Sequence, residues 1–139
     1  MNMESLYEYG SRAGFWRLHN LFQEKEIPIT IFGVGMALEK NTESFKAIIE
    51  TDYELASHGW RCIDYQNIKK SEEKKHMQLT IKAHTKIFGK RPDGWYTGRC
   101  SPNTRDLVME DGGFLYDSDS YSDDLPYWEN RNKKKQLMI

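Results

Sequence analysis

The spacing of apolar side chains along the chain predicts four helices. Between residues 12 and 25, apolar residues recur three or four positions apart, which places them on one face of a helix. Each of the other three predicted helices begins at a residue that can cap free backbone N–H groups, and glycines close two of them. These three helices are predicted after Asn41 to about Thr51, from Ser71 to Phe88 before Gly89, and from Ser101 and Pro102 to Gly112.

Short runs of β-branched and aromatic residues lie between these helices and predict four strands. The runs cover residues 29–34, 53–57, 95–96 and 114–116. Strands that alternate with helices imply right-handed crossovers and a parallel sheet. A closed eight-unit barrel needs about 250 residues, whereas this chain has 139. The sequence therefore predicts an α/β fold, a partial (β/α) barrel in which about four parallel strands alternate with four helices.

Composition and charge argue for a folded domain and against nucleic-acid-binding and membrane-spanning proteins. Hydrophobic residues make up 38% of the chain and aromatic residues 13%, which suits a folded domain. The net charge of −1 provides no electrostatic footprint for nucleic acid or an anionic membrane. The longest uncharged stretch, residues 27–38, is shorter than the roughly 20 apolar residues of a membrane span. Because Cys62 and Cys100 form no C-x-x-C pair and the first ten residues lack a signal-peptide pattern, we expect a reducing, cytoplasmic location.

The first candidate for chemistry is His58, directly after the second predicted strand. Ligands of parallel sheets bind where the strands end, and an imidazole there can bind a metal or transfer a proton near neutral pH. The alternative is a histidine with a structural role. The other three histidines, His19, His76 and His84, fall within predicted helices and are expected to be structural.

A second candidate cluster, residues 91–99, surrounds the third predicted strand. Its glycines let the backbone approach a ligand, and Trp95 and Tyr96 offer flat apolar walls. Arg99 can pair with a carboxylate or with a developing oxyanion. The alternative is that the two aromatic side chains belong to the core and Arg99 to the surface.

A third cluster, residues 117–124, contains four aspartates. It superficially resembles a calcium-binding loop, but the glycine of the sharp turn and the terminal glutamate are missing. A solvated acidic loop is the alternative interpretation.

Four segments, taken in order, resemble the polysaccharide deacetylase (NodB-homology) superfamily, and within it the allantoinases of urate degradation. They are YGSR at 9–12, ASHGWR at 56–61, GWYTGR at 94–99 and DSDSY at 117–121. The resemblance covers about residues 6 to 128. It implies a distorted (β/α) barrel of the glycoside hydrolase and deacetylase type.

The resemblance also implies an activity: hydrolysis of a non-peptide carbon–nitrogen bond in a cyclic ureide, with water as the nucleophile. An alternative is metal-dependent removal of N-acetyl groups from peptidoglycan or chitin-like sugars, and a third is a non-catalytic remnant. The expected partner is therefore a small ureide or N-acetyl sugar, and neither nucleic acid nor a membrane. The implied catalytic residues are His58, Tyr96 and Arg99, and the implied substrate-binding residues are Trp60, Trp95, Asp119 and Tyr121.

The cofactor expectation stays open between none and a divalent metal such as zinc. His58 matches the first histidine of the family's His-rich motif, and Cys62 occupies the position of the second. A catalytic zinc needs about three protein ligands and an open position. The sequence offers at most these two.

The resemblance divides the chain into a partial deacetylase-like domain, residues 1–128, and a basic tail, residues 129–139, expected to be disordered. The family's first-strand acidic residues and its later histidine motif have no counterpart in this sequence. We therefore expect a truncated or frameshifted fragment of a longer protein, which could form a homo-oligomer or need a complementing chain.

Overall fold

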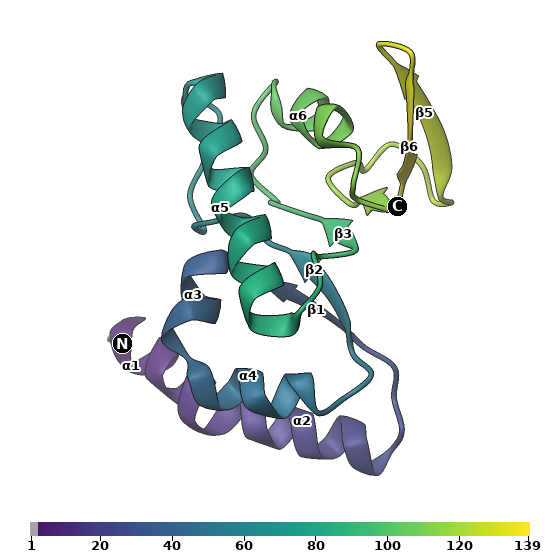
Figure 1. Ribbon diagram of the computed structural model, residues 1–139. Coiled ribbons are helices and arrows are strands. Elements are labelled where there is room, and N and C mark those ends of the chain that lie inside the picture. Colours follow the sequence, from purple (N-terminus) through teal and green to yellow (C-terminus); the bar gives the residue numbers. More distant parts are fainter. Residues whose placement is uncertain (1–2) are drawn as a thin grey trace.

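The computed structural model describes residues 3–139, except the side chain of Thr42. Its centre is a six-stranded sheet with the strand order β1-β2-β3-β4-β6-β5, and the sheet is open because β1 and β5 form its two edges (Figure 1). All neighbouring strands are parallel except β5 and β6, which form an antiparallel hairpin. The strands are β1 (Thr30–Gly33), β2 (Glu54–Ser57), β3 (Gly94–Trp95), β4 (Tyr116–Asp117), β5 (Tyr127–Arg131) and β6 (Lys134–Met138).

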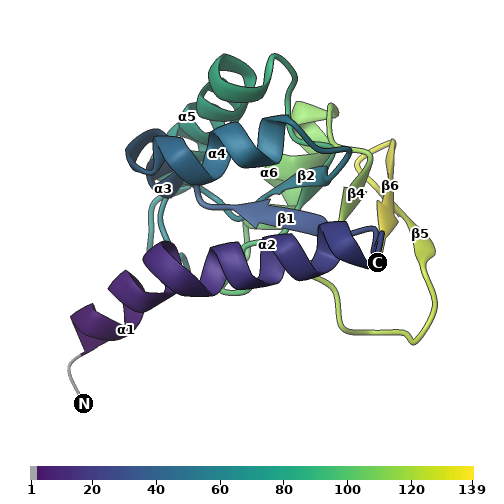
Figure 2. The ribbon, with the colours of Figure 1, turned by 90° about the horizontal axis from the view of Figure 1, so that it is seen from below.

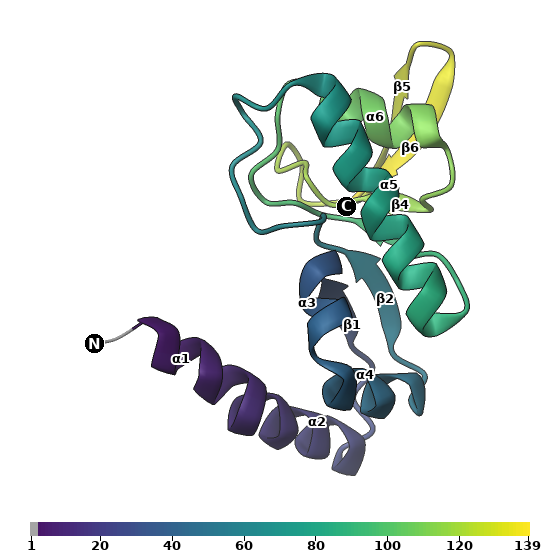
Figure 3. The ribbon, with the colours of Figure 1, turned by 60° about the vertical axis from the view of Figure 1, so that its left-hand side comes forward.

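Helices connect β1 to β2, β2 to β3 and β3 to β4, whereas β4 leads to β6 through a loop and β5. Figures 2 and 3 show α1, the π-helix η1 and α2 as one long rod whose N-terminal end projects away from the sheet. Residues 3–9 of this rod bury no side chain. The helices are α1 (Met3–Tyr9), η1 (Gly10–Gly14), α2 (Phe15–Glu24), α3 (Gly35–Lys40), α4 (Thr42–Ile49), α5 (Lys70–Phe88) and α6 (Thr104–Asp111).

Two apolar clusters hold the helices against the sheet. The first forms around β2, α3 and α4, and the second joins α5 and α6 to β3. Burial of apolar area at about 25 cal/mol per Å² makes such clusters the main stabilising contribution. The buried members are Leu38, Phe45, Ile48, Tyr53 and Leu55 in the first cluster, and Met77, Trp95, Leu107, Val108 and Phe114 in the second.

The residues that follow the parallel strands are joined by a series of backbone hydrogen bonds. The N–H of His58 donates to the carbonyl of Gly33, and the N–H of Tyr96 donates to that of Ser57, both at 2.9 Å. Ser118 continues the series by donating to Trp95 at 2.8 Å. The loops after β2, β3 and β4 therefore begin side by side at one edge of the sheet.

The open, mostly parallel α/β fold is confirmed, and so are the four predicted strands. The structure adds a fifth and a sixth strand, the helical turns of α1 and η1 before the first predicted helix, and the separate helix α3, which the sequence did not predict. All three predicted caps are wrong: the side chain of Asn41 makes no capping hydrogen bond, α5 begins at Lys70, one residue before Ser71, and α6 begins at Thr104, after Ser101 and Pro102. Gly89 and Gly112 close their helices with φ of 72° and 70°, as expected of glycine.

The prediction that residues 129–139 are disordered is wrong, because β5 and β6 form a hairpin there. Asn132 and Lys133 make its tight turn, with φ of 51° and 62°. Met138 is fully buried, and the ammonium of Lys135 lies 4.4 Å from the centre of the Trp128 ring. Consecutive lysines obscured the alternation that marks a strand. Across residues 3–139, no helix has the length and apolar character to cross a membrane.

Candidate functional site

His58 and Tyr96 lie together at the carboxyl edge of the sheet. His58 follows β2 and Tyr96 follows β3, and their ring centres are 5.3 Å apart. The Nδ1 atom of His58 is buried and has no hydrogen-bond partner among residues 3–139. A buried polar atom without a partner is costly in a folded protein. This nitrogen is therefore free to bind an atom of a ligand.

Tyr96 also contacts side chains from two other elements. The hydroxyl of Tyr121, in the loop after β4, donates a hydrogen bond to the Tyr96 hydroxyl at 3.1 Å. The ring of Phe32, on β1, lies edge-on at 5.4 Å. The side chain of Tyr121 is exposed, and its hydrogen bond to Tyr96 raises the pKa of Tyr121 to about 12. The Tyr121 phenol therefore keeps its proton at neutral pH and remains a hydrogen-bond donor.

The loop that carries Tyr96 is held by Asp119. The carboxylate of Asp119 accepts hydrogen bonds from the N–H of Thr97 at 3.0 Å, the N–H of Gly98 at 2.8 Å and the hydroxyl of Thr97 at 2.9 Å. Gly98 has φ of 67°, and a Cβ there would lie 3.1 Å from the Tyr96 hydroxyl oxygen. Only glycine fits this turn without displacing Tyr96.

These contacts correct the interpretation of the aspartate cluster as a solvated loop. Asp119 is buried, and its oxygens bind the backbone of the Tyr96 loop, which gives it a supporting position. Asp117, at the end of β4, is completely buried; its Oδ1 accepts from the N–H of Asp119, and its Oδ2 has no partner within the described chain. Loss of hydration on burial raises the pKa of Asp117 to about 6. Asp123 and Asp124 are exposed, as expected.

Arg99 and Trp60 lie on loops at the same edge. The carbonyl of Arg99 accepts a hydrogen bond from the N–H of Tyr65 at 3.1 Å, and its exposed side chain makes no ion pair or hydrogen bond within residues 3–139. Trp60 is half-buried next to Gly35, where a Cβ would lie 2.6 Å from the indole ring. The guanidinium of Arg99 is thus free to meet a ligand.

The expectation that Trp95 forms a pocket wall is wrong. Its side chain is 2% exposed and packs on Phe114 with ring centres 5.3 Å apart, on the side of the sheet that the helices cover. Adjacent residues of a strand face opposite sides, so Tyr96 faces the site and Trp95 the core. Phe32 is the aromatic side chain that the sequence reasoning missed. Its position next to Ile31, which packs in the core, was the available signal.

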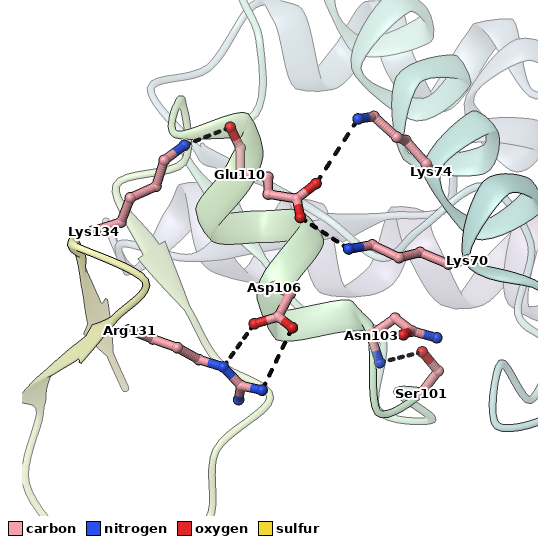
Figure 4. Close-up of polar contacts among 8 residues, drawn as sticks. All are labelled: Lys70, Lys74, Ser101, Asn103, Asp106, Glu110, Arg131 and Lys134. Carbon is pink, nitrogen blue, oxygen red and sulfur yellow. Dashed lines mark hydrogen bonds and ion pairs between the residues drawn. The ribbon is translucent and has the colours of Figure 1, made fainter.

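A cavity of about 220 Å³ adjoins Asp119, between α6 and the hairpin. Two arginines line it, and both are paired. Arg105 bonds Glu129 at 2.9 Å, and Arg131 bonds Asp106 at 2.7 Å (Figure 4). Because its arginines are already neutralised, this cavity offers no unpaired cation for an anionic ligand.

The ligand set for a metal is incomplete in this part of the chain. No group of three or more histidine, cysteine, aspartate or glutamate side chains with suitable geometry occurs in residues 3–139. A catalytic zinc site uses about three protein ligands, so these residues alone do not fit one. His58 offers an unpartnered nitrogen, and the exposed thiol of Cys62 as a second ligand stays a prediction.

The fold and the site together define an open, mostly parallel α/β protein with aromatic and titratable side chains at the carboxyl edge of its sheet. A comparison with family models then identifies the family. Residues 4–111 match the polysaccharide deacetylase model, and the chain belongs to this family.

Individual relatives support the same assignment. A Schizosaccharomyces pombe protein of the polysaccharide deacetylase class is 42% identical over 134 residues, which cover 91% of this chain and 42% of the relative. The crystal structure of PuuE allantoinase is 54% identical with a TM-score of 0.95, over 99% of this chain and 46% of that one. A Pseudomonas aeruginosa PAO1 protein of the polysaccharide deacetylase class is also 54% identical, with a TM-score of 0.94 and the same coverage. The chain thus spans less than half the length of these relatives.

Proposed function

We propose that the side chains at this site hydrolyse a carbon–nitrogen bond of a cyclic ureide and so open its ring, as an allantoinase does. The observation that supports the proposal most is the contact between His58 and Tyr96 at the carboxyl edge of the sheet. The 54% identity to PuuE allantoinase over nearly the whole chain favours a ureide substrate.

The side chains at the site suit this chemistry. The imidazole of His58 has a free nitrogen that can transfer a proton to the departing ring nitrogen or take one from the attacking water. The phenol of Tyr96 accepts the hydrogen bond from Tyr121 and keeps its own hydrogen, which it can donate to the carbonyl oxygen as negative charge develops there. Arg99, exposed and unpaired within the described chain, can bind a second carbonyl of the ureide.

A second candidate function is removal of N-acetyl groups from peptidoglycan or chitin-like sugars. It is favoured by the similarity to the Schizosaccharomyces pombe and Pseudomonas aeruginosa proteins. Both functions hydrolyse an amide-type carbon–nitrogen bond. They differ in the size of the substrate and in the need for a metal.

One set of assays distinguishes the two functions. The purified chain is incubated with allantoin and, separately, with N-acetylglucosamine oligomers, each with added zinc and with a chelator. Ring opening of allantoin supports the proposal, and release of acetate from the oligomers alone replaces it with the second function. Absence of both products, from a chain shown to be folded by circular dichroism, contradicts catalysis by this chain and leaves the non-catalytic interpretation. Sedimentation of the same sample tests the expected homo-oligomer.

A further inference from the structure

Glu73 is a buried carboxylate that the proposed chemistry does not use. It lies in the first turns of α5 and is 2% exposed. Burying a charge is costly unless hydrogen bonds compensate for the lost water. Glu73 accepts two such bonds, one from the hydroxyl of Ser101 at 2.6 Å and one from the hydroxyl of Thr104. Both donors lie in the segment that leads from β3 into α6.

The two hydroxyls are oriented by the backbone around them. The oxygen of Ser101 accepts the N–H of Asn103 at 2.9 Å (Figure 4), and the oxygen of Thr104 accepts the N–H of Ser101 at 2.8 Å. Because each oxygen receives a backbone N–H, each hydroxyl hydrogen is directed to the carboxylate. Glu73 therefore fixes the backbone turn at the start of α6 as well as two side chains.

That turn is the far end of the loop that begins with Tyr96. The near end is held by Asp119 through Thr97 and Gly98, and the middle by the hydrogen bond from Tyr65 to the carbonyl of Arg99. A loop held at both ends and in its middle has few alternative conformations. The positions of Tyr96 and Arg99 then depend on all three anchors.

We propose that Glu73 is a positioning residue that holds the loop of residues 96–104 in the conformation needed for hydrolysis. It acts through Ser101 and Thr104 and does not touch the substrate. The catalytic consequence rests on the proposed function, whereas the ordering of the loop does not. Misplacing a catalytic group by about 1 Å can cost 10²-fold in rate, so loss of this anchor reduces kcat more than it raises KM.

The test compares Glu73→Ala, Glu73→Gln and Glu110→Gln in the whole chain. Glu73→Ala removes both acceptor oxygens, and Glu73→Gln keeps one of them in a side chain of the same size. Glu110→Gln is a matched control: Glu110 also links α6 to α5, through Lys70 at 2.9 Å, but its side chain is 46% exposed (Figure 4). Exposed pairs of this kind contribute little.

Two measurements are made on each variant. The first is amide hydrogen exchange in residues 97–101 relative to β2. The second is kcat and KM on whichever substrate the assays described above show to be hydrolysed. In Glu73→Ala we expect at least tenfold faster exchange in the loop, unchanged exchange in β2, and a kcat reduced tenfold or more with KM within threefold. Glu73→Gln restores most of both losses, and Glu110→Gln matches the unmodified chain.

Loop exchange that stays unchanged in Glu73→Ala, or that rises equally in β2, overturns the proposal. A rise in KM with kcat unchanged also overturns it, because such a change indicates an effect on substrate binding. If Glu73→Ala does not fold, Ser101→Ala replaces it: this variant removes one of the two bonds, and faster exchange confined to residues 97–104 is then required. A chain without activity on any substrate contradicts the proposed function, and the exchange result still decides whether Glu73 orders the loop.

Discussion

The imidazole of His58 lies against the phenol ring of Tyr96, with the ring centres 5.3 Å apart and the planes inclined by 40°. The two residues come from separate segments and follow neighbouring strands, β2 and β3, whose Ser57 and Trp95 are in register. The parallel pairing of these strands thereby brings an imidazole beside a phenol, although α5 separates the two residues in the sequence.

Replacing His58 by alanine is expected to abolish any hydrolysis by this chain. Removal of a general acid–base group costs about 10²- to 10⁴-fold in rate. The measurement is the initial rate of substrate loss, with circular dichroism to confirm the fold. His19→Gln is the control, because His19 lies in the helical layer against Tyr53 and is expected to leave the rate within threefold. An unaltered rate in His58→Ala would remove this residue from the mechanism.

The sequence predicted the strands that carry the site because β-branched and aromatic runs are strong local signals. It could not decide which of two neighbouring aromatic residues faces the site. Trp95 and Tyr96 must point to opposite sides of the sheet, but the side covered by helices is set by packing of β3 against Phe114, far along the chain.

The structural role of the aspartates could not be predicted from local sequence patterns either. Asp119 appears in the sequence as one of four similar residues, yet it alone accepts hydrogen bonds from Thr97 and Gly98. That pairing exists only once β3 and β4 are neighbours in the sheet. The same limit applies to Asn41, which has a suitable side chain for a helix cap but makes no capping bond.

Asp119→Asn is expected to destabilise the loop and the protein. The Asp119 carboxylate accepts three hydrogen bonds, from the N–H groups of Thr97 and Gly98 and from the Thr97 hydroxyl. The amide of asparagine has only one acceptor oxygen and two N–H donors, so at least one of these three donors loses its acceptor. Hydrogen bonds to a charged acceptor contribute about 1.5–3 kcal/mol each, and we expect a loss of about 2–3 kcal/mol in urea unfolding. Asp124→Asn, at an exposed position, should change stability by less than about 0.5 kcal/mol. Equal effects of the two substitutions would contradict the anchoring role of Asp119.

Asp117→Asn is expected to stabilise the protein near neutral pH. Burial raises the pKa of Asp117 from 3.8 to about 6, so the folded state holds a proton that the unfolded state has already released. Stability of the unmodified chain relative to the variant therefore falls as the pH rises from about 4 to about 6. At 1.36 kcal/mol for each unit of pKa, the unfolding free energy of the unmodified chain relative to that of Asp117→Asn falls by about 3 kcal/mol by the time the pH exceeds 6. Urea unfolding of both proteins at several pH values measures it, and a difference independent of pH would show that Asp117 does not titrate in this range.

His84→Gln is expected to show the opposite dependence on pH. His84 is fully buried on α5, with its Nε2 3.3 Å from the carbonyl oxygen of Gly33, and burial lowers its pKa from 6.5 to about 4. Between these values the unfolded state binds the extra proton, so the unmodified chain loses stability as the pH falls from about 6.5 to about 4. The glutamine variant lacks this loss, and its stability relative to the unmodified chain should rise on acidification by up to about 3 kcal/mol.

In the unmodified chain these two dependences oppose each other between about pH 4 and pH 6, because Asp117 favours the folded state at the acidic end and His84 at the neutral end. Each substitution removes one dependence and exposes the other. The sharpest measurement is therefore the slope of unfolding free energy against pH: positive in Asp117→Asn, negative in His84→Gln, and between the two in the unmodified chain. Slopes of the same sign in both variants would show that at least one of these side chains does not control the pH response.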